Sequence, residues 1–298
     1  PLVDFRHEAM ADVERAMTQF RVRDTHTWFN PCPGVRVRMT PNGHILGSVC
    51  LEVETSDAMI GFTGDLGRES PILLHPPESL GSVQALVTES TYGDRNHATE
   101  DPSEGIRRAI LEICETRGHL IIPSFSVGRA QELLLLIHRL RESSRIPTVP
   151  VYLDSPMAIE ATAIFSGCAD WHKLAAGELN GINTVATRVR SRTQSRELLS
   201  HPGPCIIIAG SGMVTGGRVL HHLFHRLPDP SNRVLLAGFQ AAGTRGAALV
   251  AGAPDVKIHG VFVPVRAAVR VLENLSAHAD QGELQRWIAR IAAPAPRR

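Results

Sequence analysis

The feature that most constrains the fold of this chain is a long central region in which short apolar segments alternate with segments of helical spacing. The expected strands are Leu120–Ile122, Val151–Leu153, Ile206–Ala209 and Val234–Ala237, and the expected helices are Arg129–Arg141, Met157–Phe165, Gly217–Leu227 and one from about Asp101 to Thr116. Asp101 suits an N-cap and Pro102 suits the first helical position. Alternation of this kind favours a parallel sheet covered by helices on both faces.

The regions before and after this centre are rich in β-strands. The expected elements are a helix at Glu8–Phe20, strands at Val35–Met39, Leu46–Val53, Ala58–Phe62, Ala85–Thr88, Val256–His259, Val261–Val265 and Val269–Leu275, and a helix from Asp280 to about Ala289. A β-rich part that brackets an α/β part indicates one domain inserted into another. The change to strand–helix alternation comes after Gly93, and a frayed tail is expected after Ile291.

Composition excludes several classes of protein. Of the 298 residues 43% are hydrophobic and 20% charged, as in a globular chain. No apolar run reaches the roughly 18 residues of a membrane helix, and no secretion signal is visible. The five cysteines are scattered with no CxxC pair, so a reducing cytoplasmic location is expected. The formal charge of +1 disfavours a bulk electrostatic grip on nucleic acid and still allows a local basic groove.

Four acidic or imidazole residues stand at the ends of expected strands, beside small residues. They are His44, Asp65, Glu89 and His278. Loops at strand ends are where functional side chains collect, and imidazole and carboxylate groups are zinc ligands. Taken singly, each has a plainer interpretation as a turn or capping residue. Their spacing alone does not join them into one site.

Two strand–loop–helix segments rich in Ser and Gly are candidates for phosphate binding. The first contains Ser124, Ser126 and Arg129, and the second contains Ser211, Gly212, Thr215, Gly216, Gly217 and Arg218. Such loops allow backbone N–H groups to approach a phosphate, and arginine can add a bidentate contact. Neither loop matches a Walker A or GxGxxG pattern, and a tight turn that binds nothing is the alternative.

Two other clusters leave their function open. His221 and His225 lie one helical turn apart beside His222, so a metal site or plain helix packing could explain them. Arg188, Arg190, Arg192 and Arg196 form a basic stretch, which fits a solvated face or contact with an RNA backbone.

Ordered motifs along the chain resemble the β-CASP branch of the metallo-β-lactamase-fold nucleases, which includes the cleavage and polyadenylation endonuclease subunit and its prokaryotic RNA-processing relatives. The motifs lie at residues 43–48, 62–68, 89–95, 123–132, 153–158, 210–218, 238–244 and 276–280. The resemblance implies an α/β fold, α+β overall: a metallo-β-lactamase αββα sandwich, incomplete here, with an inserted β-CASP parallel-sheet domain. The sandwich would comprise residues 1–93 and 247–298, and the insert residues 94–246.

The resemblance also implies roles for individual residues. His44, Asp65 and His278 match zinc ligands, with Asp65 bridging two zinc ions in the full-length protein. Glu89 matches a residue that orients a ligand histidine and assists proton transfer. The two Ser/Gly-rich loops and Ser276 would then hold the substrate, an RNA whose phosphodiester bonds are hydrolysed.

Two departures from the family pattern limit what this chain is expected to do. The HxHxDH motif that should precede His44 is absent, and three ligands cannot satisfy two zinc ions that each need about four. Ala248 stands where the eukaryotic endonucleases carry a histidine, which puts a histidine general acid in doubt.

We therefore expect a C-terminal portion of a zinc-dependent ribonuclease, with endonuclease and possible exonuclease activity, that lacks roughly a hundred N-terminal residues. Alone, this chain should bind zinc weakly and cleave RNA poorly. The alternatives are a catalytically silent RNA-binding protein and a DNA-processing nuclease of the same superfamily, while the insert argues against a small-ester hydrolase. A homodimer is a possible assembly.

Overall fold

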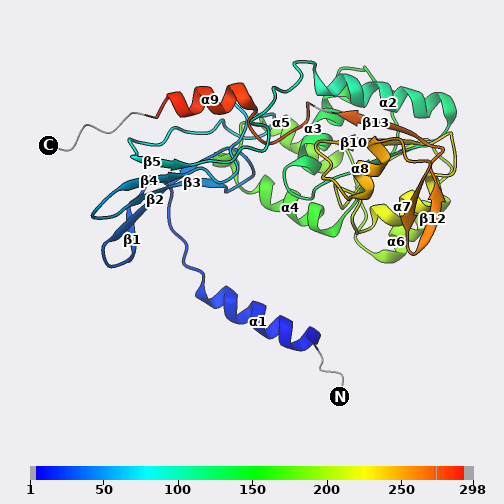
Figure 1. The fold of residues 1–298 in the computed structure, drawn as a ribbon. Coiled ribbons are helices and arrows are strands. Elements are labelled where there is room, and N and C mark those ends of the chain that lie inside the picture. The colour runs from blue at the N-terminus through cyan, green and yellow to red at the C-terminus, as the bar shows by residue number, and fades with distance from the viewer. Residues whose placement is uncertain (1–4, 273, 292–298) are drawn as a thin grey trace.

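The computed structural model describes residues 5–272 and 274–291, and it contains two large sheets that lie side by side (Figure 1). The predicted fraying after Ile291 concerns residues 292–298, which lie outside the described part. No helix in the described part is long and apolar enough to cross a membrane.

The larger sheet has six parallel strands in the order β13-β10-β6-β9-β7-β8. The strands are β6 (His119–Pro123), β7 (Val151–Asp154), β8 (Thr187–Arg188), β9 (Cys205–Ala209), β10 (Arg233–Ala237) and β13 (Ala268–Leu272). Every residue of β9 is buried. Ile206 and Ile208 point into one core cluster and Ile207 into the other, because successive side chains of a strand alternate between faces.

Helices cover both faces of this sheet, as the alternating pattern predicts. They are α2 (Pro102–Thr116), α3 (Arg129–Glu142), α4 (Pro156–Ser166), α5 (Ala176–Thr184), α6 (Arg192–Glu197), α7 (Val219–Arg226) and α8 (Arg245–Val250), with short 3₁₀ turns at Ala169–Trp171 and Leu198–Ser200. The predicted start of α2 is confirmed: Asp101 is its N-cap and accepts a hydrogen bond from the Ser103 backbone N–H at 2.9 Å. Side chains of α2 and α3 pack in one cluster, and those of α7 and α8 in the other.

The smaller sheet has five strands in sequence order, antiparallel except for the parallel pair β4–β5. They are β1 (Phe29–Cys32), β2 (Val35–Pro41), β3 (Val49–Glu54), β4 (Met59–Phe62) and β5 (Ala85–Val87). Helix α9 (Gln281–Ala289) returns from the far end of the chain to this region (Figure 1). Its Leu284 and Trp287 are buried in one cluster with Cys50 and Leu66. Segments more than 200 residues apart thus share a core.

The strands of residues 247–298, which were predicted to belong to the host domain, lie with the six-stranded sheet. β13 pairs in parallel with β10, so the six-stranded sheet extends beyond the predicted boundary at residue 246. The hairpin of β11 (Asp255–Ile258) and β12 (Val261–Pro264) packs its buried side chains into the second cluster of that sheet. Of this segment, α9 packs with the five-stranded sheet.

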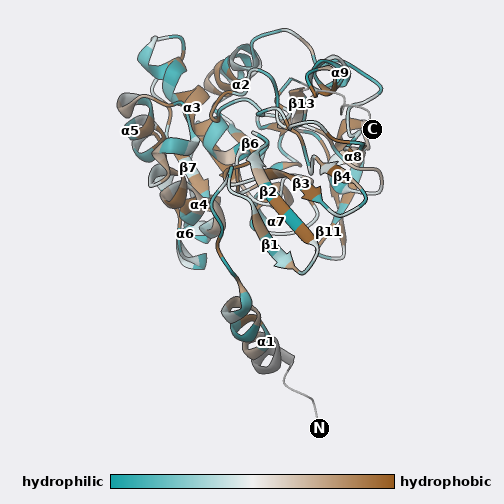
Figure 2. Ribbon diagram, turned by 90° about the vertical axis from the view of Figure 1, so that its left-hand side faces the viewer, coloured by the Kyte–Doolittle hydropathy of each residue, from teal (hydrophilic) through white to brown (hydrophobic). Residues whose placement is uncertain are grey.

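The strand expected at Leu46–Val53 begins three residues later, at Val49. Gly43 and Gly47 both adopt positive φ, and the Ser48 hydroxyl binds the Ile45 backbone, so the preceding residues form turns. Near the N-terminus, α1 (Phe5–Gln19) stands apart from both sheets (Figures 1 and 2).

Candidate metal centre and adjoining cleft

Three of the four strand-end residues converge. His44, Asp65 and His278 each offer a ligand atom, and these atoms all lie within 4.8 Å of one another. The Nε2 atom of His44 lies 3.6 Å from an Asp65 carboxylate oxygen, and the rings of His44 and His278 are 4.4 Å apart between centroids. Two imidazoles and a carboxylate are a donor set that zinc accepts.

The loops that carry these ligands are interlocked. A side chain on Gly67 would come within 2.3 Å of the Gly43 backbone, so the two loops touch through bare backbone. The buried Asn42 amide donates to the Thr63 carbonyl at 2.9 Å, and Gly67 pairs with His278 in a short β-bridge. The geometry of the ligands is therefore fixed by contacts between segments distant in sequence.

Each histidine of the centre is oriented through its Nδ1 atom. His278 Nδ1 lies 2.9 Å from a Glu89 oxygen, and His44 Nδ1 lies 3.3 Å from the Ala277 carbonyl. When Nδ1–H donates to these oxygens, the lone pair of each ring is on Nε2, where a metal ion can accept it. Glu89 also accepts a hydrogen bond from the Leu66 N–H, so its carboxylate is tied down on both sides.

The pKa values follow from these contacts. Burial and the neighbouring His278 lower the pKa of His44, which keeps it neutral as a ligand must be. Burial would lower the pKa of His278, but the hydrogen bond and charge of Glu89 outweigh it and raise the pKa. Burial likewise opposes ionisation of Glu89, yet its hydrogen bond from His278 prevails and lowers its pKa.

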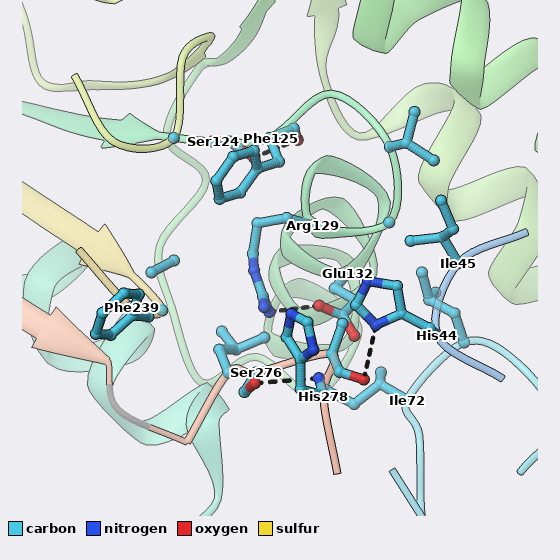
Figure 3. Close-up of a pocket in the computed structure, with 18 of the residues that line it drawn as sticks. His44, Ile45, Ile72, Ser124, Phe125, Arg129, Glu132, Phe239, Ser276 and His278 are labelled. Atoms are coloured by element: carbon cyan, nitrogen blue, oxygen red, sulfur yellow. Dashed lines mark hydrogen bonds and ion pairs between the residues drawn. The ribbon is translucent and has the colours of Figure 1, made fainter. Parts of the chain in front are cut away.

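The centre opens into a cavity of about 1120 Å³ between the two sheets (Figure 3). The predicted site residues that line it are His44, Ser124, Ser126, Arg129, Ser211, Gly212, Gly217, Arg218, Ser276 and His278. Thr215 and Gly216 are not among its lining residues, nor are Asp65 and Glu89. Phe125 and Phe239, both about half exposed, add aromatic surface to its wall (Figure 3).

The first Ser/Gly-rich loop brings a cation to the cavity. Arg129 begins α3, is 8% exposed and extends toward His278 (Figure 3). Its Nη1 pairs with Glu132, whose pKa burial raises. Its buried Nε–H has no acceptor among the described residues. Unused donor capacity beside the candidate metal ligands suits an anionic ligand.

The second loop is arranged differently from the prediction. The N–H groups of Thr215 and Gly216 donate to the Ser211 hydroxyl at 3.0 and 3.2 Å, so they bind inside the loop. Arg218 pairs with Asp154 at 2.7 Å and also donates to two backbone carbonyls. In this structure the loop thus presents fewer donors to the cavity than its sequence suggests.

Asp154 was not among the predicted functional residues, and it anchors this loop. Its fully buried carboxylate accepts hydrogen bonds from Ser195 at 2.5 Å, Arg218 at 2.7 Å and His222 at 2.7 Å. Burial opposes its ionisation, but these donors lower its pKa. An aspartate at the carboxyl end of a buried strand was the available signal, although its partners lie 41 to 68 residues away.

The histidines of α7 do not form a metal cluster with one another among the described residues. His222 is buried against Asp154, and His221 stacks on His259 with ring centroids 4.9 Å apart. Ala248 lies in α8 and packs against the second core cluster.

Comparisons with known proteins agree with this architecture. Residues 130–249 match the Beta-Casp domain, and residues 263–294 match the Zn-dependent metallo-hydrolase RNA specificity domain. The chain is 34% identical over 287 residues to Ribonuclease TTHA0252 of Thermus thermophilus, covering 93% of this chain and 65% of that protein. It is 34% identical over 289 residues to an RNase J-like protein of Methanocaldococcus jannaschii, covering 95% and 67%.

A third relative is the transcription termination factor FttA of Methanocaldococcus jannaschii, 31% identical over 282 residues, or 89% of this chain and 44% of that protein. The chain thus spans about two thirds or less of the length of these relatives. It belongs to the β-CASP family of the metallo-β-lactamase fold.

Proposed function

We propose that this chain supplies the RNA-binding cleft and part of the metal centre of a zinc-dependent ribonuclease. The observation that carries the proposal is the convergence of His44, Asp65 and His278 beside a cavity that the two histidines line and whose walls come from both sheets. The names of two relatives, a ribonuclease and an RNase J-like protein, favour RNA as the substrate.

His44, Asp65 and His278 would hold zinc, which when bound polarises a phosphoryl oxygen and makes water more acidic. Glu89 acts as a positioning residue, because its carboxylate is committed to His278 and the Leu66 N–H. Arg129 would bind a phosphate of the RNA next to the centre. Phe125 and Phe239 offer faces on which unpaired bases can stack.

The ligand set bears on how many ions this chain can hold alone. Three protein ligands, of which Asp65 would be shared, fall short of what two ions need. We propose that a complete two-ion centre takes further ligands from outside these three, and that this chain by itself binds zinc weakly and cleaves RNA slowly.

The test separates RNA binding from RNA cleavage. An end-labelled single-stranded RNA and its 2′-deoxy counterpart are incubated with the chain and Zn²⁺, and affinity and cleavage are measured separately. We expect RNA binding, slow cleavage abolished by a chelator, and loss of cleavage without loss of binding in Asp65→Asn. Asp57→Asn, an exposed turn aspartate, is the matched control and should change neither.

Each other outcome has a definite meaning. RNA binding with no cleavage at any Zn²⁺ concentration would favour the catalytically silent RNA-binding alternative for this chain. Preferential cleavage of the 2′-deoxy strand would favour a DNA-processing nuclease. Strong chelator-sensitive cleavage by the chain alone would overturn the incomplete centre.

A further inference from the structure

A second cluster of metal-ligating side chains lies at the opposite end of the six-stranded sheet from the cavity. His119 is the first residue of β6 and Cys205 the first residue of β9, and the two are direct register partners in the parallel pair. The carboxyl ends of the same two strands lead into the Ser/Gly-rich loops of the cavity. His201 lies in the connection just before β9.

The three side chains are close enough to share one ion. His119, His201 and Cys205 each offer a ligand atom, and these atoms all lie within 4.8 Å of one another. Cys205 is fully buried, while both histidines are partly exposed, so an ion has a path from solvent. In a tetrahedral zinc site with bonds of about 2.0–2.3 Å the ligand atoms lie about 3.5 Å apart, which requires only small side-chain movements here.

The hydrogen bonds of His119 fix which of its nitrogens carries a proton. The Asn232 side-chain oxygen accepts from the His119 backbone N–H at 2.8 Å, and the Asn232 amide nitrogen donates to the Arg226 carbonyl at 3.0 Å. The same oxygen lies 3.1 Å from His119 Nδ1, so Nδ1 must be the donor. This is the arrangement of a metal-binding histidine, whose other ring nitrogen donates to a neighbouring oxygen.

The remaining nitrogen of His119 has no suitable partner in this arrangement. With the proton on Nδ1, a neutral imidazole has a lone pair on Nε2, and Nε2 lies 2.9 Å from the His201 carbonyl oxygen. Two acceptors at this distance repel each other unless a cation lies beside them. Either a second proton on the His119 ring, bound at Nε2, or a metal ion would remove this repulsion.

Arg226 is a buried cation close to all three side chains. Arg226 is 4% exposed, its Nε–H has no acceptor among the described residues, and its charge acts on Cys205 and on both histidines. Burial raises the pKa of the Cys205 thiol to about 12, and the charge of Arg226 opposes this shift, so an ion bound here has to displace the thiol proton. A thiolate is the form in which cysteine binds metal.

We propose that His119, His201 and Cys205 bind a thiophilic divalent ion such as Zn²⁺, as a structural site separate from the candidate metal centre at the cavity. Two imidazoles and one thiolate are a donor set for zinc, with a water or the His201 carbonyl as the fourth ligand. His201 would exchange the hydrogen bond that its Nδ1 accepts from the Gly203 N–H for the bond to the ion. The ion would fasten the first residues of β6 and β9 to the connection that precedes β9.

Cobalt substitution tests this proposal directly. Metal-free chain is titrated with Co²⁺ and followed by absorbance, because a cysteine thiolate bound to Co²⁺ gives a charge-transfer band in the near ultraviolet. The cluster at His44, Asp65 and His278 contains no sulfur and cannot give this band. We expect the band to appear, to saturate at one equivalent per chain and to disappear on addition of Zn²⁺.

Variants identify the ligands. Cys205→Ser should abolish the band, while the control Cys114→Ser should keep it. His201→Gln changes a partly exposed loop residue, retains every cysteine, and should weaken Co²⁺ binding at this site by about tenfold or more. Circular dichroism checks that each variant is folded.

His44→Ala should leave the band intact, so the result is independent of the proposed ribonuclease activity. Absence of the band at excess Co²⁺, its survival in Cys205→Ser, or unchanged affinity in folded His201→Gln would overturn the proposal. Absence of the band would leave a doubly protonated His119 as the explanation of the short distance between its Nε2 atom and the His201 carbonyl oxygen.

Discussion

The two sheets of this chain differ in how much core supports them. The six-stranded sheet is covered on both faces and has a large cluster of buried side chains on each side. The five-stranded sheet shares a small cluster with α9, and its outer strands are mostly exposed: no residue of β1 or β5 is buried. The Ser/Gly-rich loops of the cavity follow strands of the well-supported sheet, whereas His44 and Asp65 come from the thinly supported one.

His278 joins the two regions. It lies between β13, a strand of the six-stranded sheet, and α9, which packs with the five-stranded sheet. The candidate metal centre is therefore assembled across the boundary between a strong and a weak region. Its geometry should depend more on the weak region than on the strong one.

The largest effect is expected from Asp154→Ala in the six-stranded sheet. The variant removes the shared acceptor of Ser195, Arg218 and His222, and breaking such a buried ion pair costs about 3–5 kcal/mol. Equilibrium urea unfolding measures the loss. The exposed Asp170→Ala is the control and should change the free energy of unfolding by less than about 0.5 kcal/mol.

The lowered pKa of Asp154 adds a pH dependence to the same experiment. A carboxyl group with a depressed folded-state pKa stabilises the fold above its unfolded pKa of about 3.9 and loses this contribution as the pH falls. The wild-type chain should thus lose more stability than Asp154→Ala between neutral pH and pH values below about 4. Parallel pH curves for the two proteins would contradict the role assigned to this carboxylate.

Trp287→Ala tests the weaker region. Trp287 is fully buried and donates to the Glu78 carbonyl at 2.9 Å, and removal of a buried tryptophan side chain costs about 3–5 kcal/mol. Because this core is small, we expect hydrogen-exchange protection to fall in β2, β3, β4 and α9 while β6 and β9 keep theirs. The half-exposed neighbour Ile288→Ala is the control, and equal loss in both sheets would show that they unfold as one unit.

The sequence predicted β6, β7, β9 and β10 with the helices α2, α3, α4 and α7, because buried strands and N-cap signals are local. It did not predict the short elements β8, α5, α6 and α8. It did not show that β13 belongs to that sheet, since periodicity says that a strand is half buried and not which strand it pairs with. The insertion pattern predicted that the C-terminal segment returns to the host domain, but it did not predict the contacts of α9 with the five-stranded sheet. The contacts of Trp287 depend on residues more than 200 positions away.

The candidate site was also predicted only in part. Motifs at strand ends selected His44, Asp65 and His278, and the structure brings them together. The N–H groups of Thr215 and Gly216, which were predicted to bind phosphate, donate to the Ser211 hydroxyl instead. A side chain within the loop can compete with a ligand for backbone donors, and the sequence pattern does not show which of them prevails. The contacts between His119, His201 and Cys205 also form only in the folded sheet.

Glu89→Gln tests whether the centre depends on its positioning residue. An amide at this position binds the His278 Nδ1–H less strongly than a carboxylate does, and loss of such an outer partner lowers metal affinity by about 10–100-fold. Zn²⁺ affinity is measured by competition with a chromophoric chelator in the Cys205→Ser background, so that the second cluster does not contribute. The exposed Glu115→Gln is the control, and equal affinities in the two variants would remove Glu89 from the centre.

The smallest effect is expected from Asp101→Ala at the start of α2. Its carboxylate accepts hydrogen bonds from the Ser103 N–H at 2.9 Å and the Ser103 hydroxyl at 2.6 Å, and loss of an N-cap costs about 1 kcal/mol. Urea unfolding should show this loss with no change in Zn²⁺ affinity, because α2 covers the six-stranded sheet and offers no ligand. The neighbouring Glu100→Ala is the control, and an altered metal affinity in Asp101→Ala would mean that the strongly supported region also sets the geometry of the centre.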